Sequence, residues 1–125
     1  MPKITICIDV SEMDKGIKFY TQVLGCELIK EGTEFSELRA DNTTLYLAEK
    51  PAGSNPLPAG EASRSYERHW TPVHLDFVVP DLDQCLTTLL EFGGVKEGEN
   101  SGDWGSIAFC ADPFGNGFCV MQHNT

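Results

Sequence analysis

The sequence predicts an α+β fold in which two tandem βαβββ modules form a curved mixed sheet, with helices on one side and a cleft on the other. Three observations support this prediction: an internal repeat, apolar and polar side chains that alternate along the expected strands, and glycine-containing turns between them. The 125 residues, 41% of them hydrophobic, suffice for one domain with a substantial core. We therefore expect a single domain over residues 1–125.

The repeat appears when the sequence is compared with itself at an offset of 69 positions. The strand that contains Thr5 then aligns with the strand that contains His74, and Gly25 aligns with Gly94. Strand, helix and terminating glycine recur in the same order, as expected for one structural unit that occurs twice. The expected divisions are a first module, a linker loop and a second module, at residues 3–50, 51–72 and 73–123.

Each module is expected to contain one helix and four strands. Apolar residues at helical spacing, preceded by polar residues that cap a helix start, predict the helices. Short apolar and β-branched runs separated by turns, such as the turn from Asp112 to Gly117, predict the strands. The helices are expected at residues 13–23 and 82–92, and the strands at 3–10, 27–30, 34–40, 43–49, 73–79, 106–111 and 117–122, with a weak strand after Gly94.

Alternation along the strands separates a core face from a cleft face. One set of positions is entirely apolar, so we expect it to pack against the helices. The opposite set mixes hydroxyl, thiol, imidazole and carboxylate groups, so we expect it to line a cleft. The apolar set is Ile6, Ile8, Val10, Leu45, Leu47, Leu75, Phe77, Val79, Phe118 and Val120, and the cleft set is Thr5, Cys7, Asp9, Thr44, Tyr46, Ala48, His74, Asp76, Val78, Cys119 and Met121.

The composition excludes several classes of partner. The net charge of −10 repels phosphate backbones, so we expect neither nucleic acid nor an anionic membrane as a partner, whereas a cationic ligand is tolerated. With no apolar run of the roughly 18 to 20 residues that a membrane span requires, and no signal-peptide pattern, we expect a cytoplasmic protein. The five cysteines are Cys7, Cys26, Cys85, Cys110 and Cys119. Their odd number and the lack of CxxC spacing are typical of buried thiols in a reducing compartment.

Two motifs carry a resemblance to a known superfamily. They are FYTQVLG at residues 19–25 and ADPFGNGF at residues 111–118, supported by a Val-x-acidic-apolar-Asp element before each helix. With these motifs the chain resembles the vicinal oxygen chelate superfamily, which includes glyoxalase I, extradiol dioxygenases, fosfomycin-resistance transferases and bleomycin-binding proteins. The resemblance covers nearly the whole chain apart from residues 51–71. It implies the two-module fold and a homodimer, but no single activity.

The resemblance also implies four positions at which metal-dependent members hold a divalent ion, one on each of four cleft strands. In this sequence they are Thr5, Tyr46, His74 and Cys119. Only His74 matches the superfamily pattern, in which a His or Gln stands in place of Thr5 and a Glu in place of Tyr46 and of Cys119. Because threonine and tyrosine hydroxyls are poor ligands, we expect no bound metal and no other cofactor, with a divalent metal as the alternative.

We expect the protein to bind a small cationic or aromatic ligand in the cleft without a metal, as bleomycin-binding members do. The first alternative is a metal-dependent enzyme with an atypical ligand set, either a glyoxalase-like lyase or isomerase or a dioxygenase-like protein. The second alternative is a metal-free catalyst that uses Cys119 or His74 as nucleophile or base. Whether any reaction is catalysed is left open by the sequence. The expected ligand-binding residues are Thr5, Tyr46, His74, Asp76, Cys119, Trp70 and Trp104.

Each of these residues also has a purely structural interpretation. His74 is compatible with a hydrogen-bonded strand histidine, Cys119 with an inert buried thiol, and Asp76 with a hydrated carboxylate at the cleft edge. The segment that ends at Trp70 either forms a lid over a ligand or anchors the chain where it returns to the sheet. Trp104 either lines the cleft or covers the sheet edge.

Overall fold

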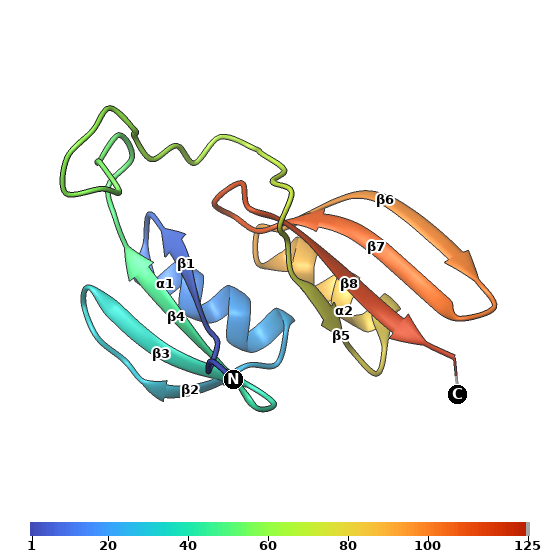
Figure 1. Cartoon of the computed structure of the whole chain (residues 1–125). Coiled ribbons are helices and arrows are strands. Elements are labelled where there is room, and N and C mark those ends of the chain that lie inside the picture. Colours follow the sequence, from blue (N-terminus) through green and yellow to red (C-terminus); the bar gives the residue numbers. More distant parts are fainter. Residues whose placement is uncertain (125) are drawn as a thin grey trace.

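The computed structural model describes residues 1–124, so the last residue of the predicted domain, Thr125, lies outside the described residues. Two four-stranded sheets form its frame, with the helices on one side of them (Figure 1). The first sheet has the strand order β1-β4-β3-β2, and the second has the equivalent order β5-β8-β7-β6. The predicted α+β fold of two βαβββ modules is therefore confirmed, with two separate ladders in place of one continuous sheet.

Nearly every element lies close to the position that the sequence pattern predicts. The first half of the chain forms β1 (Thr5–Val10), α1 (Met13–Lys18), the π-helical segment η1 (Phe19–Val23), β2 (Glu27–Lys30), β3 (Phe35–Ala40) and β4 (Thr43–Glu49). The second half forms β5 (Asp76–Val78), α2 (Leu82–Glu91), β6 (Val95–Gly102), β7 (Gly105–Ala111) and β8 (Gly117–His123).

The first helix differs from the expectation because it changes form along its length. Residues 13–23 were expected to form one α-helix, but the α-helix ends at Lys18 and a π-helical turn follows. The hydroxyl of Thr21 donates a 2.7 Å hydrogen bond to the carbonyl oxygen of Ile17, the group that the amide of Thr21 would bond in an α-helix. The threonines of α2 form the same kind of bond while that helix stays α-helical, so the bond accompanies the wider turn without being its sole cause.

Two strands of the second sheet also differ in length from the expectation. The strand expected at residues 73–79 is reduced to β5, although Leu75 still accepts a backbone hydrogen bond from β8 and Val79 still donates one to it. The weak strand expected after Gly94 is instead the eight-residue strand β6, which pairs with β7 as far as Gly102 and Gly105. β6 is polar because it is the edge strand of its sheet, with one side unpaired.

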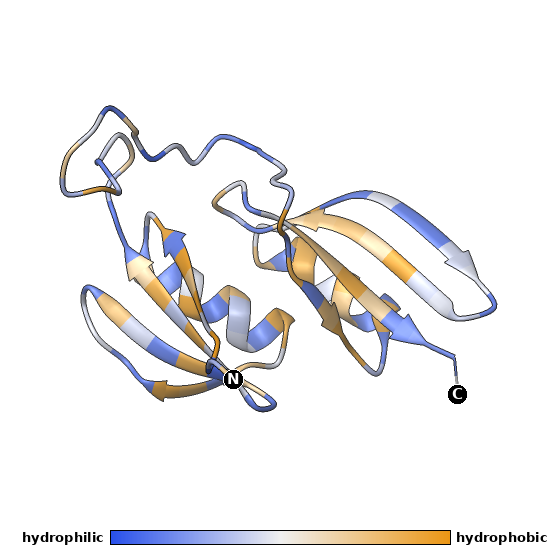
Figure 2. Cartoon of the chain, viewed as in Figure 1, coloured by the Kyte–Doolittle hydropathy of each residue, from blue (hydrophilic) through white to orange (hydrophobic). Residues whose placement is uncertain are grey.

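The first and last strands of each module lie side by side and run parallel. β1 pairs with β4, and β5 pairs with β8 in the same register, so that Cys7 faces Tyr46 and Asp76 faces Cys119 across the ladders. Hydrophobic and hydrophilic residues alternate along the strands (Figure 2). Each sheet consequently has one face against the helices and one open face, as the alternation predicts.

One hydrophobic core connects the two halves. Phe19 of η1 packs edge to face against Phe118 of β8, with ring centroids 6.0 Å apart, and the Cys85 thiol of α2 donates to the carbonyl oxygen of Val23. Most of the predicted apolar set is buried here. Four of its members are only partly buried because they lie on β1, on β5 or beside β5, at the border between the sheets: Ile6, Leu75, Phe77 and Val79.

Residues 50–75, all of them described, contain neither a helix nor a strand of the two sheets. In its first part the segment folds back on itself: the amide of Gly53 donates to the carbonyl oxygen of Arg64, and the amide of Arg64 donates to that of Ser54. Near its end, His69 forms a bridge with Asn116 in the turn between β7 and β8. An ion pair between Arg64 and Asp9 of β1 attaches the segment to the first half, and the bridge at His69 attaches it to the second. Within the described residues, no helix has the length and hydropathy that crossing a membrane requires.

Candidate functional site

Three polar side chains form a cluster on the open face of the second sheet. His74 and Asp76 are two residues apart on an extended segment, so both point to the same side, and Cys119 lies opposite Asp76 on β8. The Nε2 atom of His74 is 3.3 Å from Oδ1 of Asp76. The nitrogen, carboxylate oxygen and sulfur atoms of the three residues all lie within 4.8 Å of one another. We call these three residues the β5–β8 cluster.

The environment of Cys119 favours its protonated thiol form. Burial, the charge of Asp76 and a hydrogen bond to that carboxylate together raise the pKa of Cys119 to about 11. Because the thiolate is the nucleophilic form, a thiol that stays protonated at neutral pH is a poor nucleophile. This finding argues against the metal-free catalyst in which Cys119 acts as the nucleophile.

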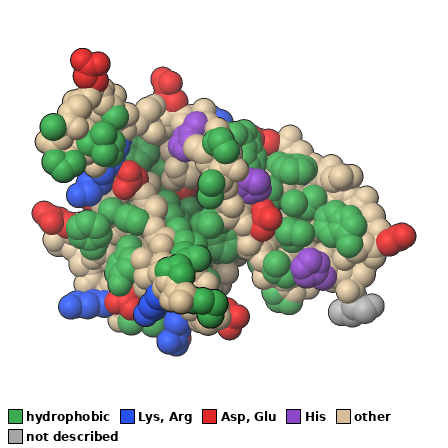
Figure 3. All heavy atoms as spheres, in the orientation of Figure 1, with side chains coloured by type: hydrophobic (Ala, Val, Ile, Leu, Met, Phe, Trp, Pro, Cys, Tyr) green, Lys and Arg blue, Asp and Glu red, His purple; other side chains and the backbone are tan. Residues whose placement is uncertain are grey.

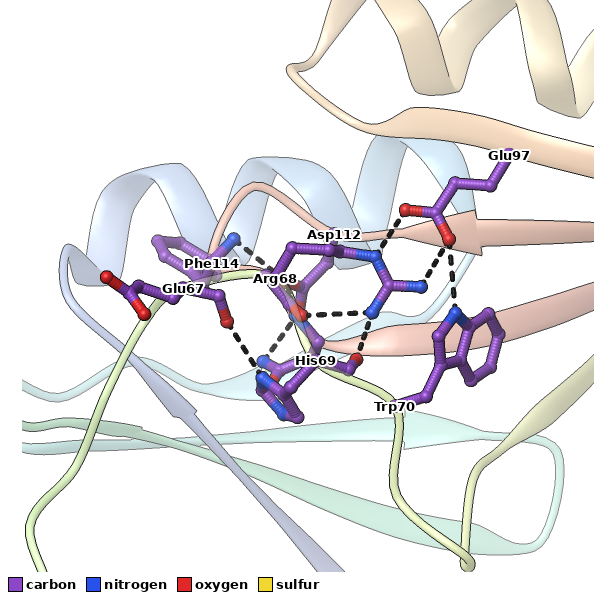
Figure 4. Close-up of polar contacts among 9 residues, drawn as sticks. Glu67, Arg68, His69, Trp70, Glu97, Asp112 and Phe114 are labelled. Atoms are coloured by element: carbon purple, nitrogen blue, oxygen red, sulfur yellow. Dashed lines mark hydrogen bonds and ion pairs between the residues drawn. The ribbon is translucent and has the colours of Figure 1, made fainter.

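Trp70 packs against the β5–β8 cluster and is itself held from the other side. Its ring meets the His74 ring edge to face, with centroids 5.7 Å apart, and its indole N–H donates a 3.1 Å hydrogen bond to Glu97 of β6. The guanidinium of Arg68 lies 4.6 Å over the Trp70 ring and forms an ion pair with Glu97 (Figure 4). The Arg68 side chain lowers the pKa of Glu97. The end of the long segment is therefore anchored on the second sheet.

A pocket of about 360 Å³ lies where the edge strands of the two sheets approach each other. We call it the junction pocket. Its rim carries polar side chains, among them Asp9, His69, His74 and Asn116, and its remaining lining is mostly apolar: Ile6, Ile8, Tyr20, Leu75, Phe77 and Phe118, with Val73 at the mouth. Both faces of β1 contribute, because a strand at the edge of a sheet exposes its two sides to a cavity beside it.

An ion pair holds the long segment over the first sheet at the side of this pocket. Nε of Arg64 lies 2.8 Å from Oδ2 of Asp9, and the same guanidinium donates to the hydroxyl of Ser54. Asp9 is therefore not an isolated negative charge at the pocket rim. Together with the Arg68 anchor on the second sheet, this contact makes the segment from 50 to 75 a strap across the two halves.

The seven predicted ligand-binding residues divide into separate groups. His74, Asp76, Cys119 and Trp70 lie together on the second sheet. Thr5 and Tyr46 lie on β1 and β4 of the first sheet, and Trp104 lies in the turn between β6 and β7, against Gly102. Of these seven described residues, His74 alone also lines the junction pocket.

The four positions that the superfamily uses for a metal do not provide a suitable set of donors in this chain. Thr5 and Tyr46 on the first sheet offer only neutral hydroxyl groups, whereas His74 and Cys119 on the second sheet are metal-binding types. A metal centre that draws one donor from each of four strands therefore does not fit. Asp76, which the sequence interpretation placed only as a contact at the cleft edge, supplies the further carboxylate beside His74 and Cys119.

Several residues around the site could not be identified from the sequence. Arg64 and Glu97 stand far from their partners in the chain, and no motif marks them, whereas Arg68 belongs to the segment before Trp70 for which a lid or an anchor was expected. The pocket walls Ile8 and Phe77 were assigned to the core, because alternation shows which side of a strand a residue occupies and not whether a neighbouring strand covers it. A pairing between β1 and β5 would be needed to close this space, and the described strands form no such pair.

Solved structures of known proteins share this fold. The fosfomycin resistance protein FosX of Listeria monocytogenes matches with a TM-score of 0.73 at 14% identity, covering 99% of this chain and 94% of that one. A glyoxalase/dioxygenase from Nostoc punctiforme gives 0.72 at 18% identity, covering 98% and 92%. A glyoxalase/bleomycin resistance protein from Streptomyces sp. CB03234 gives 0.61 at 23% identity, covering 97% and 100%. Among curated proteins there is no match.

The sequence also matches a family model. The family is described as a glyoxalase-like domain, and the match covers residues 5–121, from the first residue of β1 into β8. The matched region includes both sheets, the junction pocket and the β5–β8 cluster. Sequence, topology and structural similarity agree, and the chain belongs to the glyoxalase-like family of the vicinal oxygen chelate superfamily.

Proposed function

We propose that the chain binds a small aromatic or cationic molecule in the junction pocket, and that this binding needs no metal. The observation that carries the proposal is the pocket itself, about 360 Å³ in volume, with apolar walls and a few polar groups at the rim. Pockets for small organic ligands commonly have volumes from about 300 Å³ upward and this kind of lining. His74 is the predicted ligand-binding residue that this pocket shares.

The lining favours a flat, apolar ligand that carries a polar or charged end. Phe77 and Phe118 pack edge to face within the wall, with ring centroids 5.8 Å apart, and provide aromatic surface for stacking. His69 and Asn116 at the rim offer hydrogen-bonding groups. The net charge of −10 raises the local concentration of cations around the protein, which favours a positively charged ligand over an anionic one.

A pair of charge substitutions tests this proposal. Val73 is exposed at the pocket mouth, and Val95 is exposed on β6 and does not line the pocket. We expect a panel of cationic aromatic compounds, screened in EDTA, to include members that raise the melting temperature of the wild type and of Val95→Arg. Val73→Arg should lose these shifts, because its charge lies beside the ligand. A panel without effect on the wild type, or with equal effects on both variants, would refute the proposal.

We further propose that the protein is a homodimer. The open face of the second sheet carries exposed apolar side chains, including Val78 and Phe109, and hydrophobic side chains gather over this sheet in Figure 3. A second copy of the chain carries the same apolar face and can cover it, since exposed apolar patches commonly mark interfaces. Sedimentation equilibrium should give the mass of a dimer, and Phe109→Glu should shift it toward the monomer. A wild-type monomer at micromolar concentration would exclude the dimer.

The five free cysteines support a reducing compartment, for which we propose the cytoplasm. Four of them are buried and one, Cys7, is exposed on the first sheet. Free thiols in this number are typical of reducing environments. Fractionation of the source cells should place the protein in the cytoplasmic fraction, and recovery from a secreted fraction would contradict the proposal.

A second candidate function is a metal-dependent reaction of the glyoxalase-like lyase, isomerase or dioxygenase type. The β5–β8 cluster favours it, because histidine, carboxylate and thiol groups lie together on an open face. A structure of the relative FosX is described as a complex with Mn(II) and sulfate. Assays of metal-loaded protein on glyoxalase and dioxygenase substrates should show turnover that His74→Ala abolishes. Equal rates for the two proteins would eliminate this candidate.

A further inference from the structure

We propose that His74, Asp76 and Cys119 form a three-ligand site for Zn²⁺ within the second sheet, without any ligand from the first sheet. The site differs from the four-strand centre of the superfamily, because Asp76 takes part and the positions of Thr5 and Tyr46 do not. The inference goes beyond the proposed ligand binding and does not depend on it. It rests on the geometry, the donor types and the accessibility of the β5–β8 cluster.

The geometry is close to that of a bound ion. Ligand atoms around a tetrahedral zinc, at about 2.0 to 2.3 Å from the metal, lie about 3.3 to 3.8 Å from one another. Nε2 of His74 and Oδ1 of Asp76 are already 3.3 Å apart, and no pair of donor atoms in the cluster exceeds 4.8 Å. A side-chain movement of about 1 Å therefore brings all three donors into range. The backbone register of β5 and β8 need not change.

The three donor types favour zinc over the harder divalent ions. Thiolate and imidazole ligands suit Zn²⁺, whereas Mg²⁺ and Mn²⁺ prefer sites made of oxygen atoms. When the sulfur of Cys119 binds the ion, its proton passes to solvent, and the positive charge of the metal stabilises the resulting thiolate. The carboxylate of Asp76 then contacts the metal in place of the thiol. The complex is electrically balanced, with two negative ligands on a divalent ion.

In a single chain the cluster is open to solvent on one side, on the same sheet face as the proposed dimer contact, and supported on the other. The His74 and Asp76 side chains are 38% and 46% exposed, while Cys119 is buried and forms the floor. Trp70, held by Arg68 and Glu97, fixes the His74 ring by edge-to-face packing. Three protein ligands leave the fourth position of a tetrahedral ion free, as in catalytic zinc sites.

Substitution with Co²⁺ provides the first test, since it reports the ligands spectroscopically and needs no enzymatic activity. The metal-free protein titrated with Co²⁺ should develop near-ultraviolet sulfur-to-cobalt charge-transfer absorption and the visible bands of tetrahedral cobalt. Zn²⁺ should displace the cobalt at one equivalent per chain. Cys119→Ser should lose the charge-transfer band, and His74→Ala and Asp76→Asn should each weaken Zn²⁺ binding by more than about 100-fold, beyond the usual cost of losing an outer-sphere partner.

Matched controls separate this site from its alternatives. Cys7→Ser removes the exposed thiol on the first sheet and should leave the cobalt spectrum unchanged. Thr5→Ala and Tyr46→Phe should bind Zn²⁺ like the wild type, because these positions supply no ligand. If Thr5→Ala or Tyr46→Phe weakened Zn²⁺ binding as much as Asp76→Asn does, the metal would lie in a four-strand centre instead. Since His74 and Asp76 are exposed, their variants should fold, and unchanged Zn²⁺ affinity in both would overturn the proposal.

The zinc proposal and the ligand proposal can fail separately. Val73→Arg, which blocks the junction pocket, adjoins His74 but replaces none of the three ligands, so it should retain the sulfur-to-cobalt band that Cys119 gives. Ligand-induced melting shifts measured in EDTA report the pocket without the metal. Metal binding without a ligand shift would leave the zinc site standing alone, and a ligand shift without metal binding would leave only the pocket.

Discussion

The phenol of Tyr20, in η1, donates a 2.6 Å hydrogen bond to Oδ2 of Asp112, in the turn between β7 and β8, which lies 92 residues further along the chain. Burial, the charge of Asp112 and this bond together raise the pKa of Tyr20 well above its usual value, so the phenol remains a donor. Asp112 also accepts bonds from the amides of Phe114 and Asn116. Both sequence motifs thus meet in one buried network that joins the two halves.

Tyr20→Phe should destabilise the protein by about 1 to 3 kcal/mol, because it leaves a buried carboxylate oxygen with one donor fewer. Tyr66→Phe is the matched control, since the Tyr66 hydroxyl donates to the carbonyl oxygen of Lys50 in a half-buried position where water can replace it. Urea unfolding of both variants provides the comparison. A smaller loss for Tyr20 than for Tyr66 would contradict the structural role given to the network.

Gly115→Ala should be much more damaging than Gly53→Ala. Both glycines have a φ of 83°, so both substitutions carry the same backbone cost of about 1 to 2 kcal/mol. A Cβ at Gly53 meets nothing within 4 Å, whereas a Cβ at Gly115 lies 2.7 Å from the carbonyl oxygens of Tyr66 and Glu67. The difference in melting temperature between the two variants measures the contact of the strap with the turn. Equal losses would show that the strap gives way at no cost.

The protein should lose stability above about pH 9. Burial raises the pKa of Cys26 to about 11 and is the main cause that raises the pKa of Cys110 to about 12, from an ordinary value of 9.0. In the unfolded chain these thiols ionise near pH 9, while in the folded protein they stay protonated, so the folded state is disfavoured as the pH rises toward 11 to 12. Each thiol contributes about 1.4 kcal/mol per pH unit in this range. Unfolding free energies at increasing pH should fall, and less steeply in Cys26→Ala.

Weakening the anchor should expose Trp70 without unfolding the protein. In a Trp104→Phe background, Trp70 is the single tryptophan, and Glu97→Gln removes the ion pair with Arg68. Acrylamide should then quench the fluorescence more strongly, while stability changes by less than about 1 kcal/mol because the pair lies at the surface, where ion pairs contribute little. Glu99→Gln is the control, since Glu99 pairs with Lys96 on the same strand. Increased quenching in both variants would rule out a specific anchor.

The fold was accessible from the sequence because its signals are local. Alternation in β3 and β4, helical spacing before Gly94 and the turn after Asp112 each depend on residues within a few positions of one another. The 69-residue offset then related the two halves. These patterns predicted the strand order of neither sheet, but they were sufficient for the fold class.

The site was only partly accessible, because it depends on how distant strands meet. Alternation placed His74, Asp76 and Cys119 on one face, yet their approach follows from the parallel register of β5 with β8. The junction pocket depends on two edge strands that do not pair, and the anchor depends on a side-chain contact between Arg68 and Glu97. No local pattern reports either feature.

The pairing of β1 with β4 affects the order in which the chain folds as it leaves the ribosome. The first sheet has all its strands once Glu49 has emerged, so its ladder can form while the second half is still being synthesised. Its apolar side, however, is completed by Phe118, which packs on Phe19 and is synthesised well after Glu49. During that interval the nascent chain exposes the apolar side of its first sheet, and aggregation through this surface is what a chaperone bound there prevents.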